Sequence, residues 1–305
     1  HLSDRRQRQM CIRDSLQSAQ LLSKDESLYS ALKLGLFDYV SKNNFEKVLV
    51  GLSGGIDSAL TATIAVDALG SNNVVGVALP SKYNKEESLV DARLLAENLD
   101  IEFKVIEIEE IVNIFRNTLK ESVNDELGPI TDENIQSRVR GNILMALSNQ
   151  TGAMVVSTGN KSEMAVGYST LYGDLAGGFA LLKDLYKTEV YNLANFRNSI
   201  SSVIPQNTID KEPSAELRPD QFDKDSLPEY ELLDEILRMY IEEDSSSEKI
   251  ISKGIDENIV YDVLSKVDRN EYKRKQVAPG VKLTEKAFGK DRRMPITNTY
   301  IRERG

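Results

Sequence analysis

The sequence predicts an α/β fold, a doubly wound parallel sheet with helices on both faces and a helical C-terminal extension. Short apolar segments of strand length alternate with longer segments of helical periodicity, which is typical of parallel strands joined by right-handed crossovers. A glycine-rich loop follows the first of these strands and leads directly into an apolar helix. The composition, with 40% hydrophobic and 28% charged residues, is that of an ordinary globular protein.

Apolar periodicity gives the order of the elements. A helix with apolar positions Leu28, Leu32, Leu36 and Phe37 precedes the first strand. The expected strands are 47–52, 74–79, 102–108 and 153–157. The expected helices between them are 57–69, which ends at Gly70, and then 85–98, 111–127 and 131–150. Ligands bind at the carboxyl ends of the strands in such sheets, so the loops after Leu52 and Ser157 are the informative ones.

The sequence changes character beyond Ile204. The segment 205–228 has four prolines, many charges and little periodicity, so we predict a lid or a linker there. Short helices are expected at 232–240 and 255–267, followed by a basic tail. Residues 1–15 are basic and non-periodic, and we expect either a non-native leftover or a disordered arm that precedes a single domain at 16–305.

Charge and rare residue types exclude several classes of function. The chain has 38 basic and 48 acidic residues, and the net charge of −10 disfavours general binding to nucleic acid. Cys11 and His1 are the only residues of their types, which excludes an intrachain disulfide, a Cys/His zinc site and a Ser-His-Asp triad. No apolar run approaches ~18 residues, and the N-terminus lacks the apolar core of a signal peptide. We therefore predict a cytoplasmic protein with no membrane partner.

The hexapeptide SGGIDS, residues 53–58, is a candidate anion site. Two consecutive glycines let backbone N–H groups approach a ligand, and the helix that follows adds partial positive charge. Asp57 would repel a phosphate unless Mg²⁺ lay between them, so the loop indicates phosphate plus metal. The alternative is a Gly-Gly turn with an Asp or Ser helix cap. The sequence contains neither a Walker P-loop nor a GxGxxG loop, which disfavours γ-phosphoryl transfer and hydride transfer.

The hexapeptide resembles the SGGxDS loop of the N-type ATP pyrophosphatases, which split ATP to AMP and pyrophosphate and have an adenine nucleotide alpha hydrolase-like fold. Further segments resemble, in family order, the synthetase domain of NAD synthetases. These segments are LPSKY (79–83), SRVR (137–140), STGNKSEMAVGYSTLYGD (157–174), EPSAEL (212–217), EYKRK (271–275) and RRMPI (292–296). The resemblance spans about residues 16 to 300.

This resemblance implies ATP-dependent amidation of deamido-NAD (nicotinic acid adenine dinucleotide) to NAD, the last step of NAD biosynthesis. ATP would adenylate the substrate carboxylate and release pyrophosphate, after which ammonia would displace AMP. The resemblance also implies Mg²⁺ and a homodimer or higher homo-oligomer. Two alternatives remain open, namely a GMP synthetase-like enzyme with the same loop and a non-catalytic ATP-binding module of the same fold.

The resemblance also implies roles for particular residues. The implied ATP site comprises Gly51, Leu52, Ser53, Gly54, Gly55, Ile56, Asp57, Ser58, Thr158, Lys187 and Ser214. Deamido-NAD would bind Arg138, Tyr168, Leu171, Tyr272 and Lys273. Asp57 and Glu163 would hold Mg²⁺. The implied catalytic residues are Asp57, Lys187 and Asp174, the last placed to bind ammonium and take its proton.

Four of these residues also have a purely structural interpretation. Glu163 can complement a helix dipole, Asp174 can form a turn, Tyr168 can fill the core, and Lys187 can lie on a solvated helix face.

The nitrogen source depends on Leu171. Simple ammonia-dependent synthetases carry lysine at this position before Tyr-Gly-Asp, and the surrounding sequence is more similar to that of glutamine-dependent enzymes. Those enzymes have an N-terminal amidase domain, which these 305 residues do not contain. We expect the chain to be the synthetase half of a longer glutamine-dependent protein. The alternative is a separate enzyme that uses free or partner-supplied ammonia.

Overall fold

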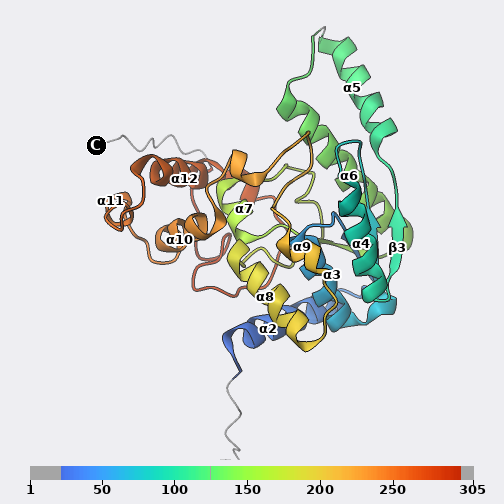
Figure 1. Ribbon diagram of the computed structural model, residues 1–305, viewed down its shortest axis with the longest axis horizontal. Coiled ribbons are helices and arrows are strands. Elements are labelled where there is room, and N and C mark those ends of the chain that lie inside the picture. The colour runs from blue at the N-terminus through green and yellow to red at the C-terminus, as the bar shows by residue number, and fades with distance from the viewer. Residues whose placement is uncertain (1–21, 124, 297–305) are drawn as a thin grey trace, which may run out of the picture.

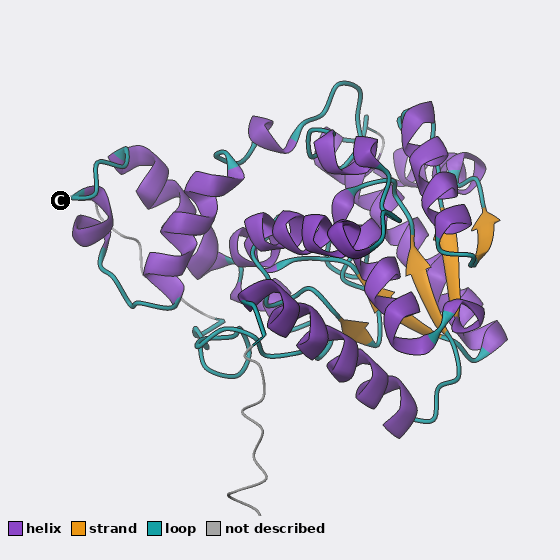
Figure 2. Cartoon of the chain, turned by 60° about the horizontal axis from the view of Figure 1, so that its bottom comes forward, coloured by secondary structure: helices purple, strands orange, loops and turns teal. Residues whose placement is uncertain are grey.

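The computed structural model describes residues 22–123 and 125–296, so the predicted segment 1–15 lies outside the described residues. Five parallel strands form one sheet in the order β3-β2-β1-β4-β5 (Figures 1 and 2). The strands are β1 (Val48–Gly51), β2 (Val74–Ala78), β3 (Glu102–Val105), β4 (Met154–Ser157) and β5 (Phe179–Ala180). The chain builds outward from β1 to β3 and then returns to the other side of β1. This confirms the doubly wound sheet and places its switch point between β1 and β4.

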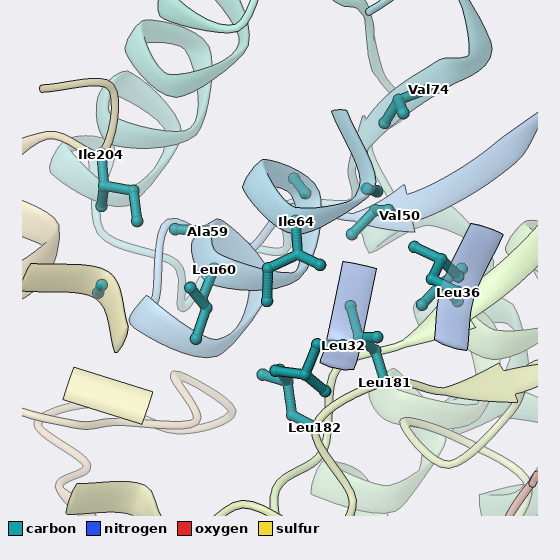
Figure 3. Close-up of a cluster of buried hydrophobic side chains, with 14 of the residues drawn as sticks. Leu32, Leu36, Val50, Ala59, Leu60, Ile64, Val74, Leu181, Leu182 and Ile204 are labelled. Carbon is teal, nitrogen blue, oxygen red and sulfur yellow. The ribbon is translucent and has the colours of Figure 1, made fainter. Parts of the chain in front are cut away.

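Helices pack on both faces of the sheet, as the sequence predicts. Val48 and Val50 of β1 contribute to one hydrophobic cluster, and Leu49 contributes to another, because successive side chains of a strand point to opposite faces. Figure 3 shows the first cluster, where side chains of the helices and of β1 meet. The helices of this cluster are α2 (Lys24–Lys42), α3 (Ile56–Leu69), α4 (Glu86–Asn98), α8 (Lys187–Ile200) and α9 (Gln206–Asp210). The opposite face is covered by α5 (Glu109–Val123) and α6 (Pro129–Thr151).

A helical lobe follows the sheet and lies beside it, at the left of Figure 1. Its core is a separate hydrophobic cluster, in which Leu233, Leu237, Val263 and Leu264 are fully buried. The expected C-terminal helical extension is therefore confirmed. The helices of the lobe are α10 (Tyr230–Ile241), α11 (Ser247–Ile251), α12 (Glu257–Arg269) and α13 (Glu271–Arg274), and α7 (Lys161–Val166) packs against them.

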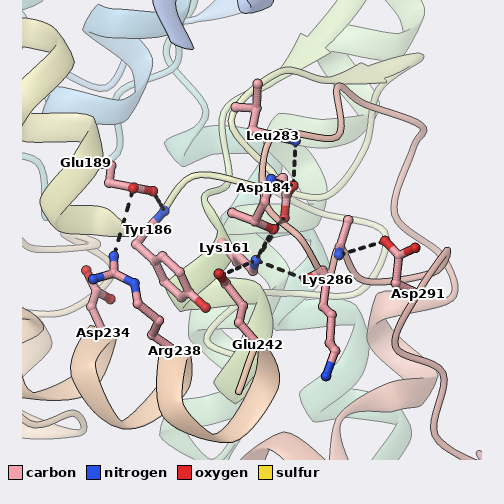
Figure 4. Close-up of polar contacts among 12 residues, drawn as sticks. Lys161, Asp184, Tyr186, Glu189, Asp234, Arg238, Glu242, Leu283, Lys286 and Asp291 are labelled. Atoms are coloured by element: carbon pink, nitrogen blue, oxygen red, sulfur yellow. Dashed lines mark hydrogen bonds and ion pairs between the residues drawn. The ribbon is translucent and has the colours of Figure 1, made fainter. Parts of the chain in front are cut away.

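A buried lysine connects this lobe and the C-terminal segment to the loop that follows β5 (Figure 4). The ammonium of Lys161, which is fully buried, lies 3.0 Å from Asp184 and 3.0 Å from Glu242 and donates to Thr284 Oγ1 at 2.6 Å. Asp184 in turn accepts hydrogen bonds from the backbone N–H groups of Leu283 and Thr284, at 2.7 and 2.8 Å. The segment expected as a basic tail is therefore anchored, at this point, in the interior of the molecule.

Some boundaries differ from the sequence prediction. The strand expected at 102–108 ends at Val105, since its neighbour β2 is followed by Pro80, which has no N–H to continue the ladder. Phe37, expected in the core, is 48% exposed on the outer face of α2. The segment 205–228 is less irregular than expected, because it contains α9 and a 3₁₀ turn, η2 (Asp223–Asp225). A second 3₁₀ turn, η1 (Ser71–Asn73), follows Gly70, whose positive φ of 85° ends α3 as predicted. No helix in the described residues is long and apolar enough to span a membrane.

Candidate active site

A cavity of about 300 Å³ opens at the carboxyl ends of β1, β2 and β4. The loop after β1, the start of α7 and the segment 211–217 contribute to its wall. This is the switch point of the sheet, where ligands of doubly wound folds bind. The sequence-predicted residues on the cavity wall are Gly51, Leu52, Ser53, Gly55, Ile56, Asp57, Ser58, Thr158, Glu163, Tyr168, Asp174, Lys187 and Ser214.

The hydroxyl groups of Ser53 and Ser58 stabilise the conformation of the glycine loop 53–58. Gly54 has a φ of 81°, and a Cβ at this position would lie 2.2 Å from the carbonyl oxygen of Ser88, so only glycine fits. The N–H of Gly55 donates to Ser53 Oγ at 3.2 Å, and Ser58 Oγ donates to the Gly55 carbonyl at 2.9 Å. Among the described residues no side chain caps the N-terminus of α3. Its first N–H groups are therefore left for a ligand in the cavity, which favours the anion site over the capped turn.

Three charged side chains converge beside this helix N-terminus. Lys187 Nζ lies 2.5 Å from Asp57 Oδ2 and 3.2 Å from Glu163 Oε1. The Lys187 side chain is only 4% exposed, which excludes the interpretation of a solvated helix face. The three residues come from the starts of α3, α7 and α8, so the fold brings together charges that are distant in the sequence.

Asn160, which the sequence analysis missed, orients two of these groups. Its Nδ2 donates to Asp57 Oδ1 at 2.9 Å, and its Oδ1 accepts from the N–H of Glu163 at 3.0 Å. The second contact is half of a capping box that starts α7. The spacing Asn-x-x-Glu is a local signal from which this cap could have been predicted.

The site has more carboxyl groups than ammonium groups. Burial alone would lower the pKa of Lys187, but Asp57 and Glu163 together raise it above its usual value, so the ammonium stays charged. Burial raises the pKa of Glu163, and the carboxylates of Asp57 and Asp223 raise it further, against the opposing effect of Lys187. Asp57, Glu163 and Asp223 therefore lie around one ammonium, and the raised pKa of Glu163, about 8, means that a bound cation would be needed to keep this carboxyl ionised at neutral pH.

The donor set fits Mg²⁺. Asp57 and Glu163 both approach Lys187 Nζ, so their oxygens lie near one another at the mouth of the anion loop. Within residues 22–123 and 125–296 no group of three or more acidic, His or Cys side chains forms a complete metal cage. Mg²⁺ characteristically uses one or two carboxylates together with water and substrate phosphates, which is what these two side chains beside a phosphate-sized loop offer.

Asp174 has an unusual environment. It is exposed to the cavity, its N–H donates to Ser137 Oγ at 3.0 Å, and its Oδ1 accepts from the N–H of Thr170 at 2.8 Å. Reduced hydration inside the cavity raises the pKa of this carboxyl to about 6, although the Thr170 N–H and the charge of Lys273 oppose the shift. At neutral pH the group is therefore ionised and close enough to its pKa to exchange a proton.

The other predicted substrate residues lie outside this cavity wall. Arg138 Nε donates to the carbonyl of Leu171 at 3.2 Å, so these two meet. Lys273 Nζ donates to the carbonyls of Gly167 and Ser169 at 2.7 and 2.8 Å. Tyr272 is 45% exposed. Arg138 and Lys273 thus both contact the segment 167–174, which leads to Asp174.

Tyr168 contacts the segment 205–228 through a hydrogen bond to Asp223, another residue that the sequence analysis missed. Tyr168 and Tyr230 donate their hydroxyls to Asp223 at 3.2 and 2.7 Å, and Asp223 lines the cavity. Tyr168 lines the cavity as well and also packs against the helical lobe. Arg140, Asn84 and Glu216 were also missed and line the cavity.

Residues 28–277 match the family model for NAD synthase. The chain belongs to the NAD synthase family. It is 55% identical over 279 residues to the glutamine-dependent NAD(+) synthetase of Aquifex aeolicus, a match that covers 92% of this chain and 49% of that relative. The chain therefore spans about half the length of the curated NAD synthases that it matches.

Solved structures of the NAD synthase family agree with the fold. The glutamine-dependent NAD+ synthetase of Acinetobacter baumannii, in complex with ADP, is 47% identical with a TM-score of 0.64, over 93% of this chain and 52% of that one. The NH3-dependent NAD synthetase of Campylobacter jejuni, in complex with nitrate, is 29% identical with a TM-score of 0.67, over 83% of this chain and 96% of that one.

Proposed function

We propose that this chain amidates deamido-NAD to NAD at the expense of ATP, which is split to AMP and pyrophosphate. The observation that carries the proposal is the convergence of Lys187, Asp57 and Glu163 beside the uncapped N-terminus of α3. That arrangement suits a triphosphate with its metal. Membership of the NAD synthase family supports the choice of deamido-NAD as the molecule to be activated.

In the first step a carboxylate oxygen of deamido-NAD attacks the α-phosphorus of ATP, and the bond from this phosphorus to the β-phosphate oxygen breaks. The residues Gly51 to Ser58 hold the leaving pyrophosphate through backbone N–H groups and hydroxyls, and Thr158 and Ser214 contact the nucleotide. Lys187 neutralises phosphate charge. Asp57 and Glu163 hold Mg²⁺, which when bound neutralises charge on the phosphates.

In the second step the nitrogen of ammonia attacks the carbonyl carbon of the adenylate, AMP leaves, and the added nitrogen loses a proton. We assign to Asp174 the binding of ammonium and the acceptance of the proton that ammonium loses to become the attacking NH₃, because its pKa of about 6 leaves it ionised at neutral pH, and the proton lost after addition passes to solvent. The dinucleotide itself is assigned to Arg138, Tyr168, Leu171, Tyr272 and Lys273, which lie along or beside the segment that leads to Asp174.

Several parts of the proposal concern the protein as a whole. We infer that it works in the cytoplasm and takes ammonia either free or from a glutamine amidase domain or subunit. The segment 205–228 acts as a lid. We also infer a homodimer or higher homo-oligomer, supported by Ile111, Ile114 and Phe115, which are exposed on α5. Light scattering after size exclusion tests that inference.

The activity is tested by pyrophosphate release in the presence of ATP, Mg²⁺ and ammonium. Release that requires deamido-NAD and yields NAD supports the proposal. Release that responds to XMP instead indicates a GMP synthetase-like enzyme, and no release with either acceptor indicates a binding module. Lys187→Ala should abolish release, whereas the matched control Lys42→Ala, an exposed lysine paired with Asp38 on α2, should not.

A further inference from the structure

The helix α8 starts at the proposed ATP site, and two side chains from other helices hold its first turn. Lys187 is its first residue, and the Lys187 N–H donates to Ser162 Oγ of α7 at 2.9 Å. The N–H and the hydroxyl of Thr188 both donate to Asp234 Oδ2 of α10, at 2.9 and 2.8 Å. N–H groups of a first helical turn have no partner within the helix, so these external acceptors fix where α8 begins.

Asp234 also connects α7 to α8. Its Oδ1 accepts a hydrogen bond from Ser162 Oγ, and Ser162 directly precedes Glu163 in α7. Asp234 is only 2% exposed. One buried carboxylate therefore joins the starts of α7 and α8, which carry Glu163 and Lys187. Figure 4 shows Asp234 on α10 beside Arg238, whose guanidinium lies 3.8 Å from Glu189 of α8.

The other end of α8 is held by a comparable contact that has no connection with the site. Arg197, in the last turn, donates through two nitrogens to Asp67 at 2.6 and 3.0 Å, and Tyr29 donates to the same carboxylate at 2.6 Å. At 1.5 Å per residue this contact lies about 15 Å along the helix from Lys187. Asp67 thus provides a matched control, since its loss weakens the packing of α8 without releasing the start of the helix.

We propose that Asp234 is a positioning residue that sets the location of the Lys187 ammonium for the triphosphate of ATP. The inference rests on the role proposed above for Lys187. If the first turn of α8 shifts, Lys187 Nζ loses its contacts of 2.5 Å with Asp57 and 3.2 Å with Glu163. Because α10 belongs to the helical lobe and contributes nothing to the sheet, the lobe takes part in building the ATP site.

The test compares the dissociation constant of ATP, measured by calorimetry with Mg²⁺ on the whole chain, between the parent and five variants. Asp234→Ala removes both acceptors and should weaken ATP binding about tenfold, in line with the loss of a helix cap. Asp234→Asn keeps an acceptor for Thr188 and should restore affinity to within about threefold of the parent. Asp67→Ala should lower the unfolding temperature but leave ATP affinity unchanged. In a Lys187→Ala background, Asp234→Ala should add no further loss.

The outcomes separate this inference from the proposed function. If Lys187→Ala leaves ATP affinity unchanged, the proposed phosphate role of Lys187 is wrong. If Lys187→Ala weakens binding but Asp234→Ala does not, or if Asp67→Ala weakens it as much as Asp234→Ala, the positioning role is refuted. Should Asp234→Ala fail to fold, Ser162→Ala replaces it. That variant removes the acceptor for the Lys187 N–H, and an unchanged ATP affinity in it would equally refute the inference.

Discussion

The change of Asp57 to asparagine tests the electrostatic core of the proposed site. The substitution removes one negative charge and keeps the shape of the side chain. Asn160 can still donate to the remaining carbonyl oxygen at position 57, and Lys187 keeps its contact with Glu163 at 3.2 Å. The perturbation therefore removes one charge and, because an amide nitrogen cannot accept a hydrogen bond, the contact of position 57 with the Lys187 ammonium.

The structure allows the costs in stability and in rate to be compared. Asp57 lies in the first turn of α3, where a carboxylate stabilises the helix dipole by about 0.3 to 1 kcal/mol. Its loss also removes one of the two ion pairs of Lys187 and, in the opposite direction, removes repulsion from Glu163, whose pKa it raises, so gains and losses in stability oppose one another. A charge that acts on the transferring phosphate is worth about 3 kcal/mol or more, which corresponds to a factor of about 10² in rate. We therefore expect a large loss of rate and a small change in stability.

The assay is the rate of pyrophosphate release at saturating ATP and deamido-NAD over a series of Mg²⁺ concentrations, with the unfolding temperature measured in parallel. Asp38→Asn, on the exposed surface of α2, serves as the control for loss of an aspartate charge. A variant at position 57 that keeps parental turnover and the parental dependence on Mg²⁺ would refute the metal role. A variant that has lost rate only because it is unfolded would be identified by its unfolding temperature.

Three other results are expected. Asp174 has a native pKa of about 6 against about 3.9 in an unfolded chain, so its contribution to stability falls as the pH rises from about 4 to about 6. Asp174→Asn should therefore melt at a higher temperature than the parent at pH 8 but not at pH 4. Equal melting temperatures at pH 8 would contradict the raised pKa. Trypsin should cut the segment 205–228, at Lys211 or at the exposed Lys224, more slowly when ATP and deamido-NAD are both bound, whereas equal cutting would leave this segment a linker. With limiting ammonium the rate should rise from about pH 7 to about pH 8.5, because NH₃ is the nucleophile, and glutamine should not replace ammonium. Cys11→Ser, a change outside the described residues, should have no effect on activity. If the parent used glutamine and this variant did not, residues 1–15 would have a catalytic role, contrary to the expectation of a non-native leftover or a disordered arm.

The order of the elements as far as β4 could be predicted because it depends on local patterns, whereas α7 and α8 were not among the expected helices. Apolar strands such as 48–51 and the glycine loop after them carry their signal within a few residues, and the structure confirms both. Shorter features have weaker signals. The two residues of β5 and the five of α9 were missed because segments of this length show no measurable periodicity.

The contacts of the site were less predictable because they are long-range. Lys187 is separated from Asp57 by 130 positions and from Glu163 by 24, and its burial follows from these two partners rather than from its own helix. Its place in the site came only from resemblance to a family. Asp223 and Asp234 carry no local signal at all, since their partners are set by the packing of the helical lobe.

The anchoring of Lys161 has a consequence for the order in which the chain can acquire its structure during synthesis. The ribosome delivers Lys161 and Asp184 long before Thr284, yet the buried ammonium and carboxylate depend on that late segment for hydrogen bonds. Until it arrives, a fully formed interior would enclose polar groups without all their partners, which is costly. The nascent domain therefore cannot complete its interior stepwise from the N-terminus, because its folding awaits Thr284, which is translated 100 residues after Asp184.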